Sequence, residues 1–507
     1  MKRSRILYAG ALFLACAGAA QAANSAATLS RDDALWLDRV TYGLDSTTVA
    51  RFRELGRRRF LDEQLAGKND GLPAPVRAQI DDLDIAHQPA AKLVVDEIAE
   101  QKRINALGDD EMKKSARKDR NDMGNKMAYE ATRRELLRAI YSPDQLKEQL
   151  VWFWLNHFNV FAQKGYVKFL AGDYVDQSIR PYALGHFRDL VMATLKSPAM
   201  LQYLDNAQNA KDHINENYAR ELMELHTLGV DAGYTQGDVQ ELAKVLTGVG
   251  IDPNHDDPKV RPALRRYLMR EGLFTFNPER HDFGDRVLLG QKIKGGGFDE
   301  VEHAVDLLVK QPACAQFVSR KLAAYFVADD PPPKLVEKMA HAFQHSDGDI
   351  AAVLRTMFES DEFTTSLGRK FKDPMHYVVS SVRLAYDGKT ITNMHPIVTW
   401  LNNQGEALFG HSTPDGYALT ENAWASSGQM SRRFEIARII GSGNAGLFDA
   451  ADGTKSLDMG FPKLSSKLYY DGIEPYLSKT TLAALDRSAS QQEWNAFLLA
   501  SPEFNSR

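Results

Sequence analysis

Apolar residues recur at helical spacing along nearly the whole chain. Apolar positions separated by three and four residues are clear in FRELGRRRFLDEQLAG, QLKEQLVWFWLNHFNVF, FRDLVMATLKSPAMLQYL, VEHAVDLLVKQPACAQFVSRKLAAYFV and DIAAVLRTMFESDEF. Alternating runs bounded by turn residues, which are typical of strands, are scarce. A chain of 507 residues with 44% hydrophobic content can also bury a large core. The sequence therefore predicts an all-α fold, a large multi-helix domain.

Residues that break helices gather in a few places, which we expect to be loops. They occur in GIDPNHDDPKVRP, in GQKIKGGGFDE, in VADDPPPK and in the polar stretch from Asn402 to Thr420. Between the first two, LFTF and RVLL are short enough to pair as a small β-hairpin around residues 264–290. The chain from residue 23 to 507 would then be one helical domain, with two lobes (about 28–250 and 295–507) joined by residues 251–294.

The first 22 residues have the layout of a secretory signal peptide. Lys2, Arg3 and Arg5 precede an apolar run that ends in the small-residue triplet Ala20 to Ala22. We therefore expect a periplasmic or secreted protein. A lipoprotein anchored at Cys16, in LFLAC, is the less favoured alternative because Phe13 stands where Leu is usual. No other apolar stretch reaches the roughly 18 to 20 residues that a transmembrane helix needs.

Charge and cysteine content narrow the classes of partner and of fold. Removal of the signal peptide takes Lys and Arg from 62 to 59 against 67 acidic residues, so the net charge falls from -5 to -8. An acidic protein of this kind is not expected to bind nucleic acid. Cys314 is then the one remaining cysteine, so the fold must rely on its core, in which Cys314 is expected to be a buried small residue.

The segment NENYARELMELHTLG, residues 215–229, is the most unusual helix of the sequence. Asn215 can cap it, and Gly229 can end it in a left-handed conformation. A helix of about four turns aligns the polar side chains of Asn217, Glu221 and Glu224, beside an apolar set of Tyr218, Leu222 and Leu225. His226 then points toward the buried side.

Two interpretations of this helix remain open. It can be an ordinary amphipathic helix, with Glu216 and Arg220 paired on its wet face and His226 as a hydrogen-bonded core residue. Alternatively, Glu221 and Glu224, if shielded from water, have coupled protonation and can act as acid and base or as metal ligands. The second is favoured by the surroundings, because LDN (residues 204–206) precedes the segment, and Thr235 and Asp238 follow as a turn and cap for the next helix.

Several long motifs resemble the bacterial family known as domain of unknown function 1800. They are SPAMLQYLDN, NENYARELMELHTLGVDAGYTQGDVQELAKVLTG and FNPERHDFGDRVLLG, together with LDRVTYGLDSTTVARF, LVWFWLNHF, KLAAYFV and LLASPEF. The resemblance covers nearly all of the chain after the signal peptide. It implies export, and it implies the company of a second exported family similar to sulfatases and alkaline phosphatases. It implies no established activity.

Carried over position by position, the resemblance gives a set of polar residues. They are Asn156, His157, Asp205, Asn206, Asn215, Glu216, Asn217, Arg220, Glu221, Glu224, His226, Asp238, His281 and Asp282. The chain departs from the family at Arg286, where the family has Lys, and at Gly416-Tyr417, where the family has Gly-Trp. Any ligand contact made by that Lys or Trp is therefore in doubt.

Three further motifs have both a functional and a structural interpretation. In WFWLNHF, Asn156 and His157 fit either a packed aromatic core or a sugar-binding wall. In ERHDFGD, His281, Asp282 and Asp285 can begin a site for a divalent metal, or they can hold a turn. GSGNAG, residues 441–446, has the glycine spacing of a dinucleotide loop but follows a helix, so we interpret it as a helix end.

The sequence thus favours a hydrolase or lyase that acts on an extracellular polymer, a glycan. In this hypothesis Glu221, Glu224, His226 and Arg220 form the catalytic set. Substrate-binding residues would be Asn156, His157, Asp205, Asn206, Asn217 and Asp238, with His281 and Asp282 as metal ligands. The alternative is a non-catalytic helical accessory that binds a neighbouring sulfatase-like or phosphatase-like protein, its polar set being a buried network that fixes helix register. A third is a metal-dependent phosphatase or sulfatase accessory.

Overall fold

The computed structural model describes residues 28–69, 71–254, 257–450, 454–456 and 460–507. The predicted signal peptide, residues 1–22, lies outside the described residues. Helices dominate the rest of the chain, so the all-α class is confirmed. Among the residues described, no helix combines the length and hydropathy that crossing a bilayer requires.

The first part of the chain is a run of helices that ends near residue 245. In order they are α1 (Arg31–Val40), α2 (Ser46–Ala66), α3 (Ala74–Asp81), α4 (Asp84–His87), α5 (Ala90–Ala106), α6 (Asp110–Tyr141), α7 (Gln145–His157), α8 (Val167–Asp173), η1 (Tyr174–Ile179), η2 (Arg180–Tyr182), α9 (Phe187–Lys196), α10 (Pro198–Tyr203), η3 (Asn206–Gln208), α11 (Asn217–Glu221), η4 (Leu222–Thr227) and α12 (Gln236–Val245).

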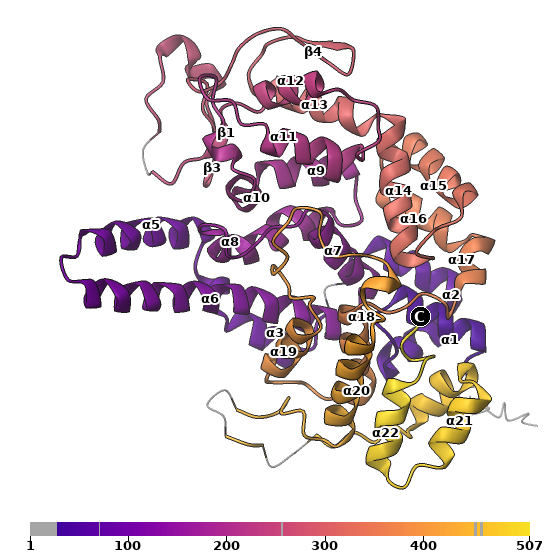
Figure 1. The fold of residues 1–507 in the computed structure, drawn as a ribbon. Helices are drawn as coiled ribbons and strands as arrows, with labels where there is room; N and C mark the ends of the chain where they lie inside the picture. Colours follow the sequence, from indigo (N-terminus) through magenta and orange to yellow (C-terminus); the bar gives the residue numbers. More distant parts are fainter. Residues whose placement is uncertain (1–27, 70, 255–256, 451–453, 457–459) are drawn as a thin grey trace, which may run out of the picture.

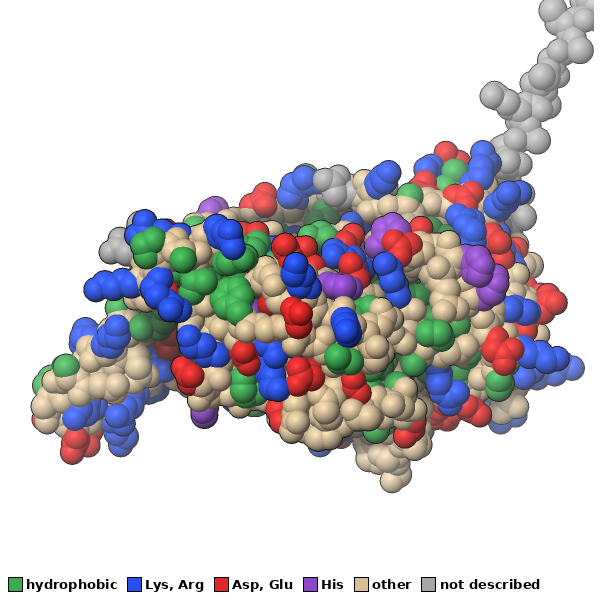
Figure 2. Space-filling view, turned by 90° about the horizontal axis from the view of Figure 1, so that it is seen from above, with side chains coloured by type: hydrophobic (Ala, Val, Ile, Leu, Met, Phe, Trp, Pro, Cys, Tyr) green, Lys and Arg blue, Asp and Glu red, His purple; other side chains and the backbone are tan. Residues whose placement is uncertain are grey.

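Helices α5 and α6 form a long hairpin that projects from the body (Figure 1). The charge-dense residues 110–141 form a single helix of 32 residues, capped by Asp109, whose carboxylate accepts a hydrogen bond from the Met112 amide. Seen from above, basic and acidic side chains are interspersed over the surface (Figure 2). The hairpin is therefore a solvated pair of helices, held at its base by the contacts of α6 with α8.

The middle of the chain forms two small antiparallel sheets rather than the predicted pairing. Strands β1 (Val249–Ile251), β3 (Phe274–Phe276) and β2 (Met269–Glu271) make one sheet, and β4 (Arg286–Leu288) and β5 (Gln291–Ile293) make the other; η5 (Pro262–Tyr267) precedes β2. The expected partner of LFTF was RVLL, and this was wrong. Strand β2 pairs with β3 and β4 pairs with β5, each across a short turn. Strand β1 pairs with β3, which is more distant in the sequence.

The last part of the chain is again helical. It comprises α13 (Phe298–Val309), α14 (Pro312–Phe326), α15 (Pro333–His345), α16 (Ile350–Phe358), α17 (Asp361–Ser366), α18 (Pro374–Ala385), α19 (His395–Asn403), η6 (Glu421–Ala423), α20 (Ser427–Gly441), η7 (Tyr469–Ile473), η8 (Glu474–Tyr476), α21 (Lys479–Asp486) and α22 (Gln491–Ala500). Helix α20 ends at Gly441, as GSGNAG predicted, and Cys314 is fully buried in α14.

One hydrophobic core holds these parts together. The buried apolar residues form a single cluster that runs from Leu29 to Phe504. The segment between α19 and α20, orange in Figure 1, leaves the C-terminal helices and folds back over α7. It therefore brings residues near 410 against residues near 156, and this contact defines the candidate site.

Candidate functional site

The helix predicted for residues 215–229 has a different form in its second half. It begins as α11, where the Asn217 amide donates to Asn215 Oδ1 at 3.0 Å, and it ends at Gly229, whose φ of 88° confirms the left-handed terminator. Between them η4 is a π-helix, with the Leu228 amide donating to the Met223 carbonyl at 2.8 Å. A π-turn adds a residue to the turn, and such turns recur at functional sites.

Glu221 and Glu224 lie on the same face of this helix, both partly buried. Arg220 holds Glu224 at 3.4 Å (Nη1 to Oε1) and also contacts Glu216 and Gln236. Within the described ranges, no hydrogen-bond partner is found for the Glu221 carboxylate. Burial and the neighbouring charge of Glu224 raise the pKa of Glu221, against the opposing effect of Arg220.

A third carboxylate, Asp415, reaches this face from the segment between α19 and α20. Its charge adds to the rise in the pKa of Glu221. Asp415 Oδ1 accepts a hydrogen bond from the Thr413 hydroxyl at 2.6 Å and lies 3.2 Å from His411 Nε2. Asp415 is exposed, and its slight loss of solvation acts to raise its pKa, but the contacts with Thr413 and His411 outweigh this and hold the pKa below its usual value. The pKa values of these two neighbouring carboxyl groups are therefore shifted in opposite directions.

Asn156 fixes the loop that carries Asp415. The Asn156 side-chain amide donates to the Tyr417 carbonyl at 3.0 Å and accepts from the Tyr417 amide at 2.6 Å. Gly416, the residue before Tyr417, has a φ of 73°. A Cβ at this position would lie 2.2 Å from the Asn156 carbonyl oxygen. Only glycine fits this position, which explains the Gly of the Gly416-Tyr417 pair.

Further contacts anchor the same loop to the first half of the chain. Asn159 donates to the carbonyls of His411 and Thr413, at 3.0 and 2.8 Å. The Tyr203 hydroxyl donates to the Ser412 carbonyl at 2.8 Å. Tyr417, in place of the family's Trp, stacks on Trp152 with ring centroids 6.4 Å apart. The carboxylate of Asp415 is thus held by a fixed scaffold rather than by a free loop.

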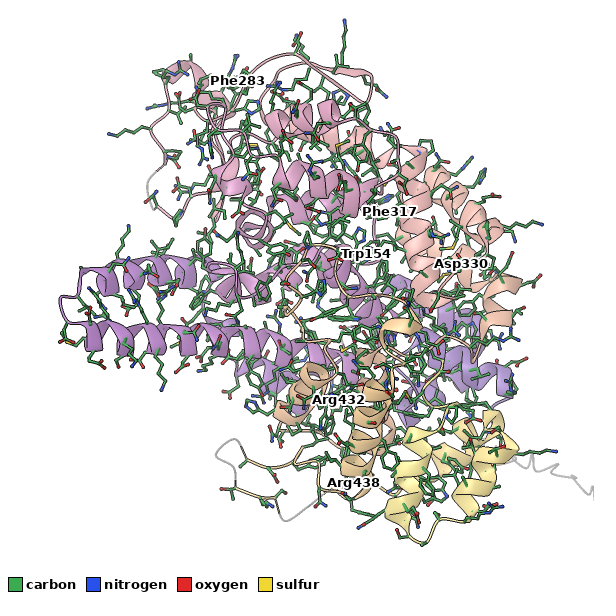
Figure 3. All side chains as sticks on the ribbon, in the orientation of Figure 1. Trp154, Phe283, Phe317, Asp330, Arg432 and Arg438 are labelled. Atoms are coloured by element: carbon green, nitrogen blue, oxygen red, sulfur yellow. The ribbon has the colours of Figure 1, made fainter. Side chains whose placement is uncertain are left out.

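Lys321 on α14 is close enough to Asp415 for the two charges to interact. Its ammonium sits 5.5 Å from the centre of the Phe317 ring, one helical turn earlier. Burial lowers the pKa of Lys321 to about 8, although the charge of Asp415 opposes this. Figure 3 labels Phe317 on α14 and Trp154 on α7, and the ring of His157 joins them, with centroids 6.1 Å and 5.5 Å away.

Two buried histidines adjoin Lys321. His157 Nε2 lies 3.0 Å from the His226 carbonyl, which only accepts, so Nε2 carries the proton and Nδ1 is an acceptor. Burial and the charge of Lys321 lower the pKa of both imidazoles, that of His226 to about 3. In the residues that the structure describes, neither nitrogen of His226 has a partner, nor has Nδ1 of His157. Both rings are therefore neutral, with unmet hydrogen-bonding capacity.

Several residues predicted to bind substrate instead bind the protein's own main chain. Asn206 donates to the Val249 carbonyl at 2.9 Å, and Asn217 donates to the Leu204 carbonyl at 3.1 Å. Asp238 forms the predicted capping box with Thr235 and also accepts from the Leu289 amide. Asp205 adopts a φ of 60° and pairs with Lys164. These side chains shape the loops around Glu221.

His281 and Asp282 lie in a separate cluster. His281 Nε2 is 2.7 Å from Glu300 Oε1, and its Nδ1 is 2.8 Å from the Thr247 carbonyl, so neither ring nitrogen is free for a metal in this arrangement. Asp282 pairs with Arg286 at 3.3 Å, which accounts for the basic residue there. In the described part of the chain, no three His, Cys, Asp or Glu side chains are grouped so as to hold a metal ion.

The structure therefore adds residues that the sequence did not single out. Asp415 and Lys321 complete the cluster with Glu221, and Asn159 and Tyr203 support it. The available signals were weak: a polar loop for Asp415 and a lysine one turn after Phe317 for Lys321.

A cleft of about 750 Å³ between α9 and the β2–β3 turn contains none of the predicted site residues.

Comparison with known proteins gives a family and no relative of known activity. No curated protein and no solved structure matches the chain. The model of one family matches residues 35–506, with the description "Protein of unknown function (DUF1800)". The match spans the helix with Glu221, the loop with Asp415 and the helix with Lys321, so the chain belongs to the DUF1800 family.

Proposed function

We propose that this protein is an exported hydrolase or lyase that acts on an extracellular glycan by acid–base catalysis. The observation that carries the proposal is the contrast between two neighbouring carboxyl groups: the pKa of Glu221 is raised, whereas that of Asp415 is lowered. Environments that drive two such pKa values apart are how enzymes assign the roles of acid and base.

Glu221 is the general acid in this proposal, and Asp415 is the general base. In hydrolysis, Glu221 gives its proton to the oxygen of the bond that breaks, while Asp415 takes a proton from the attacking water. In elimination, Asp415 takes a proton from carbon, the C–O bond breaks, and a C=C bond forms in the product. Export rests on the N-terminal sequence alone.

The other predicted catalytic residues act indirectly. Glu224, held by Arg220, supplies a negative charge that helps to raise the pKa of Glu221. His226 has no exposed surface, so a polymer cannot touch it. We assign Glu224, Arg220 and His226 positioning roles.

The test is a screen of the purified protein against neutral and acidic polysaccharides. New reducing ends report cleavage, and unsaturated products report elimination. Glu221→Gln and Asp415→Asn are each expected to lower turnover by about 100-fold or more. Glu337→Gln, a change at an exposed carboxylate on α15, is the matched control and should leave turnover unchanged. Equal activity in all variants would refute the assignment.

A second candidate is the accessory role. It is supported by the way Asn156, Asn206 and Asn217 hold main chain rather than face open space. It predicts no turnover across the panel and a stable complex with an exported sulfatase-like or phosphatase-like protein in pull-downs. A role as a metal-dependent accessory predicts stoichiometric divalent metal by elemental analysis after purification without chelators.

A further inference from the structure

Lys321 differs from the other lysines that the fold encloses. Lys370 pairs with Asp329, Lys372 pairs with Asp38 at 3.2 Å, and Lys168 donates to Asn121 at 2.7 Å. Over the described ranges of the chain, the Lys321 ammonium has no hydrogen-bond or ion-pair partner. The ammonium instead lies over the face of the Phe317 ring, 5.5 Å from the ring centroid.

The nearest carboxylate does not satisfy this charge. Asp415 Oδ1 is engaged by Thr413 and His411, at 2.6 and 3.2 Å. Lys321 therefore holds a positive charge in a partly buried place without a counterion. Such a charge costs free energy unless a ligand supplies the opposite charge.

The two histidines beside Lys321 do not neutralise its charge either, and they lie below the surface that a polymer can reach. His226 is completely buried and His157 is 2% exposed, yet three of their four ring nitrogens have no partner among the described residues. A buried polar atom without a partner costs about 1 to 3 kcal/mol. A neutral imidazole supplies no counterion, so the Lys321 ammonium stays unpaired on this side as well.

We propose that Lys321 receives an acidic group of the substrate, a carboxylate or a sulfate ester, so that the site selects acidic glycans over neutral ones. This inference rests on the proposed function and assigns its substrate class. The charges of Glu224 and Asp415 disfavour an anion on the rest of this face, so the acidic group is expected to bind at Lys321. Lys321 would thereby set the position of the bond relative to Glu221 and Asp415.

Binding can be measured without turnover. Sodium glucuronate and inorganic sulfate serve as probes, with glucose as the neutral control, in NMR titrations that follow the lysine ε-methylene signals. We expect glucuronate, sulfate or both to shift the Lys321 signal, and glucose to leave it unchanged. A response to glucuronate alone identifies a carboxylate, and a response to sulfate alone identifies a sulfate ester.

Matched variants make the test specific. Lys321→Met should weaken probe binding about tenfold or more, which is 1.4 kcal/mol, whereas Lys321→Arg should retain most of it. Lys334→Met, at an exposed lysine of α15, should bind as the wild type does. Affinity should fall as the pH rises through about 8 in the wild type, because Lys321 loses its charge, and not in Lys321→Arg. Equal binding by wild type and Lys321→Met would overturn the proposal.

The proposal and the function beneath it fail in different ways. If acidic probes bind through Lys321 but no glycan is cleaved, acid–base catalysis is wrong and the anion site stands. If a neutral glycan is cleaved equally by wild type and Lys321→Met, catalysis stands and acidic selectivity is wrong.

Discussion

Two clusters of charged side chains in this fold differ in whether their charges are paired. Under α6, α7 and η1, three arginines (Arg134, Arg138 and Arg180) pair with three carboxylates (Glu135, Glu148 and Asp176), with contacts such as Arg180 to Glu148 at 2.7 Å. At the candidate site, Glu221 and Lys321 have no such partner among the described residues. The comparison teaches that a fully paired cluster holds helices together, whereas an unpaired one is available to a ligand.

The largest expected effect comes from breaking the paired cluster. Glu135→Gln leaves Arg134, Arg138 and Arg180 short of one counterion in a buried place, and we expect a loss of about 3 to 5 kcal/mol of unfolding free energy. Denaturant unfolding measures it, with Glu337→Gln as the control. If both variants unfold alike, the paired cluster does not hold the helices.

Low pH should weaken the same paired cluster of arginines and carboxylates. Burial opposes the ionisation of Glu135, but its three arginines prevail and lower its pKa to about 2. A lowered pKa contributes stability that is present above the unfolded value near 4.3 and is lost as the pH falls toward 2. Glu135→Gln should therefore flatten the decline of melting temperature between pH 5 and pH 2, which differential scanning calorimetry can follow.

The next effect concerns the loop that carries Asp415. Gly416→Ala must place a Cβ against the Asn156 carbonyl at positive φ, so we expect the loop to detach, at a cost of at least about 1 to 3 kcal/mol from the backbone strain. Gly405→Ala is a matched control, because its φ is also positive, at 80°, but nothing lies within 4 Å of the added Cβ. Amide hydrogen exchange of residues 409–420 should rise in the first variant and much less in the second.

A smaller effect of opposite sign is expected at the unpaired cluster. Glu221→Gln and Lys321→Met each remove a charge that the fold does not satisfy, so the melting temperature should stay level or rise by a few degrees. Because the folded pKa of Glu221 is raised, its contribution to stability is present below the unfolded pKa and is lost as the pH rises through the folded value. The gain in Glu221→Gln should thus be larger at pH 8 than at pH 4. A drop of several degrees would make Glu221 part of a structural network.

The smallest effect tests whether pairing matters without burial. Lys92 and Asp96 form an exposed ion pair on α5. Lys92→Ala should change unfolding free energy by no more than about 1 kcal/mol, since water screens such pairs. A loss as large as that of Glu135→Gln would show that pairing alone, rather than pairing in a buried place, stabilises the fold.

The sequence predicts what local spacing determines and misses what distant contacts determine. The period of apolar residues identified the helical class, and Thr235 with Asp238 identified a helix start. The pairing of LFTF could not be predicted, because three-residue strands carry too little information to select a partner. The π-turn at residues 222–227 was missed because its residues suit an α-helix equally well.

The same distinction between local spacing and distant contacts applies to the residues of the candidate site. Glu221 and Glu224 were found because they share one helix. Asp415 and Lys321 come from other parts of the chain, and nothing local marks them as neighbours of Glu221. His281 and Asp282 show the same limit: their adjacency indicated a metal site, whereas the structure places Glu300, 19 positions later, against the imidazole.

The hydrogen bonds between Asn156 and Tyr417 join positions that are 261 residues apart. A contact of such long sequence separation carries the entropic cost of closing a long loop of chain, which slows folding. While the chain is being synthesised, the segment with Glu221 therefore exists well before Asp415 and Lys321 can reach it. A partly made chain would hold Glu221 without Asp415 and Lys321, so the proposed site is complete only when these later segments have packed against it.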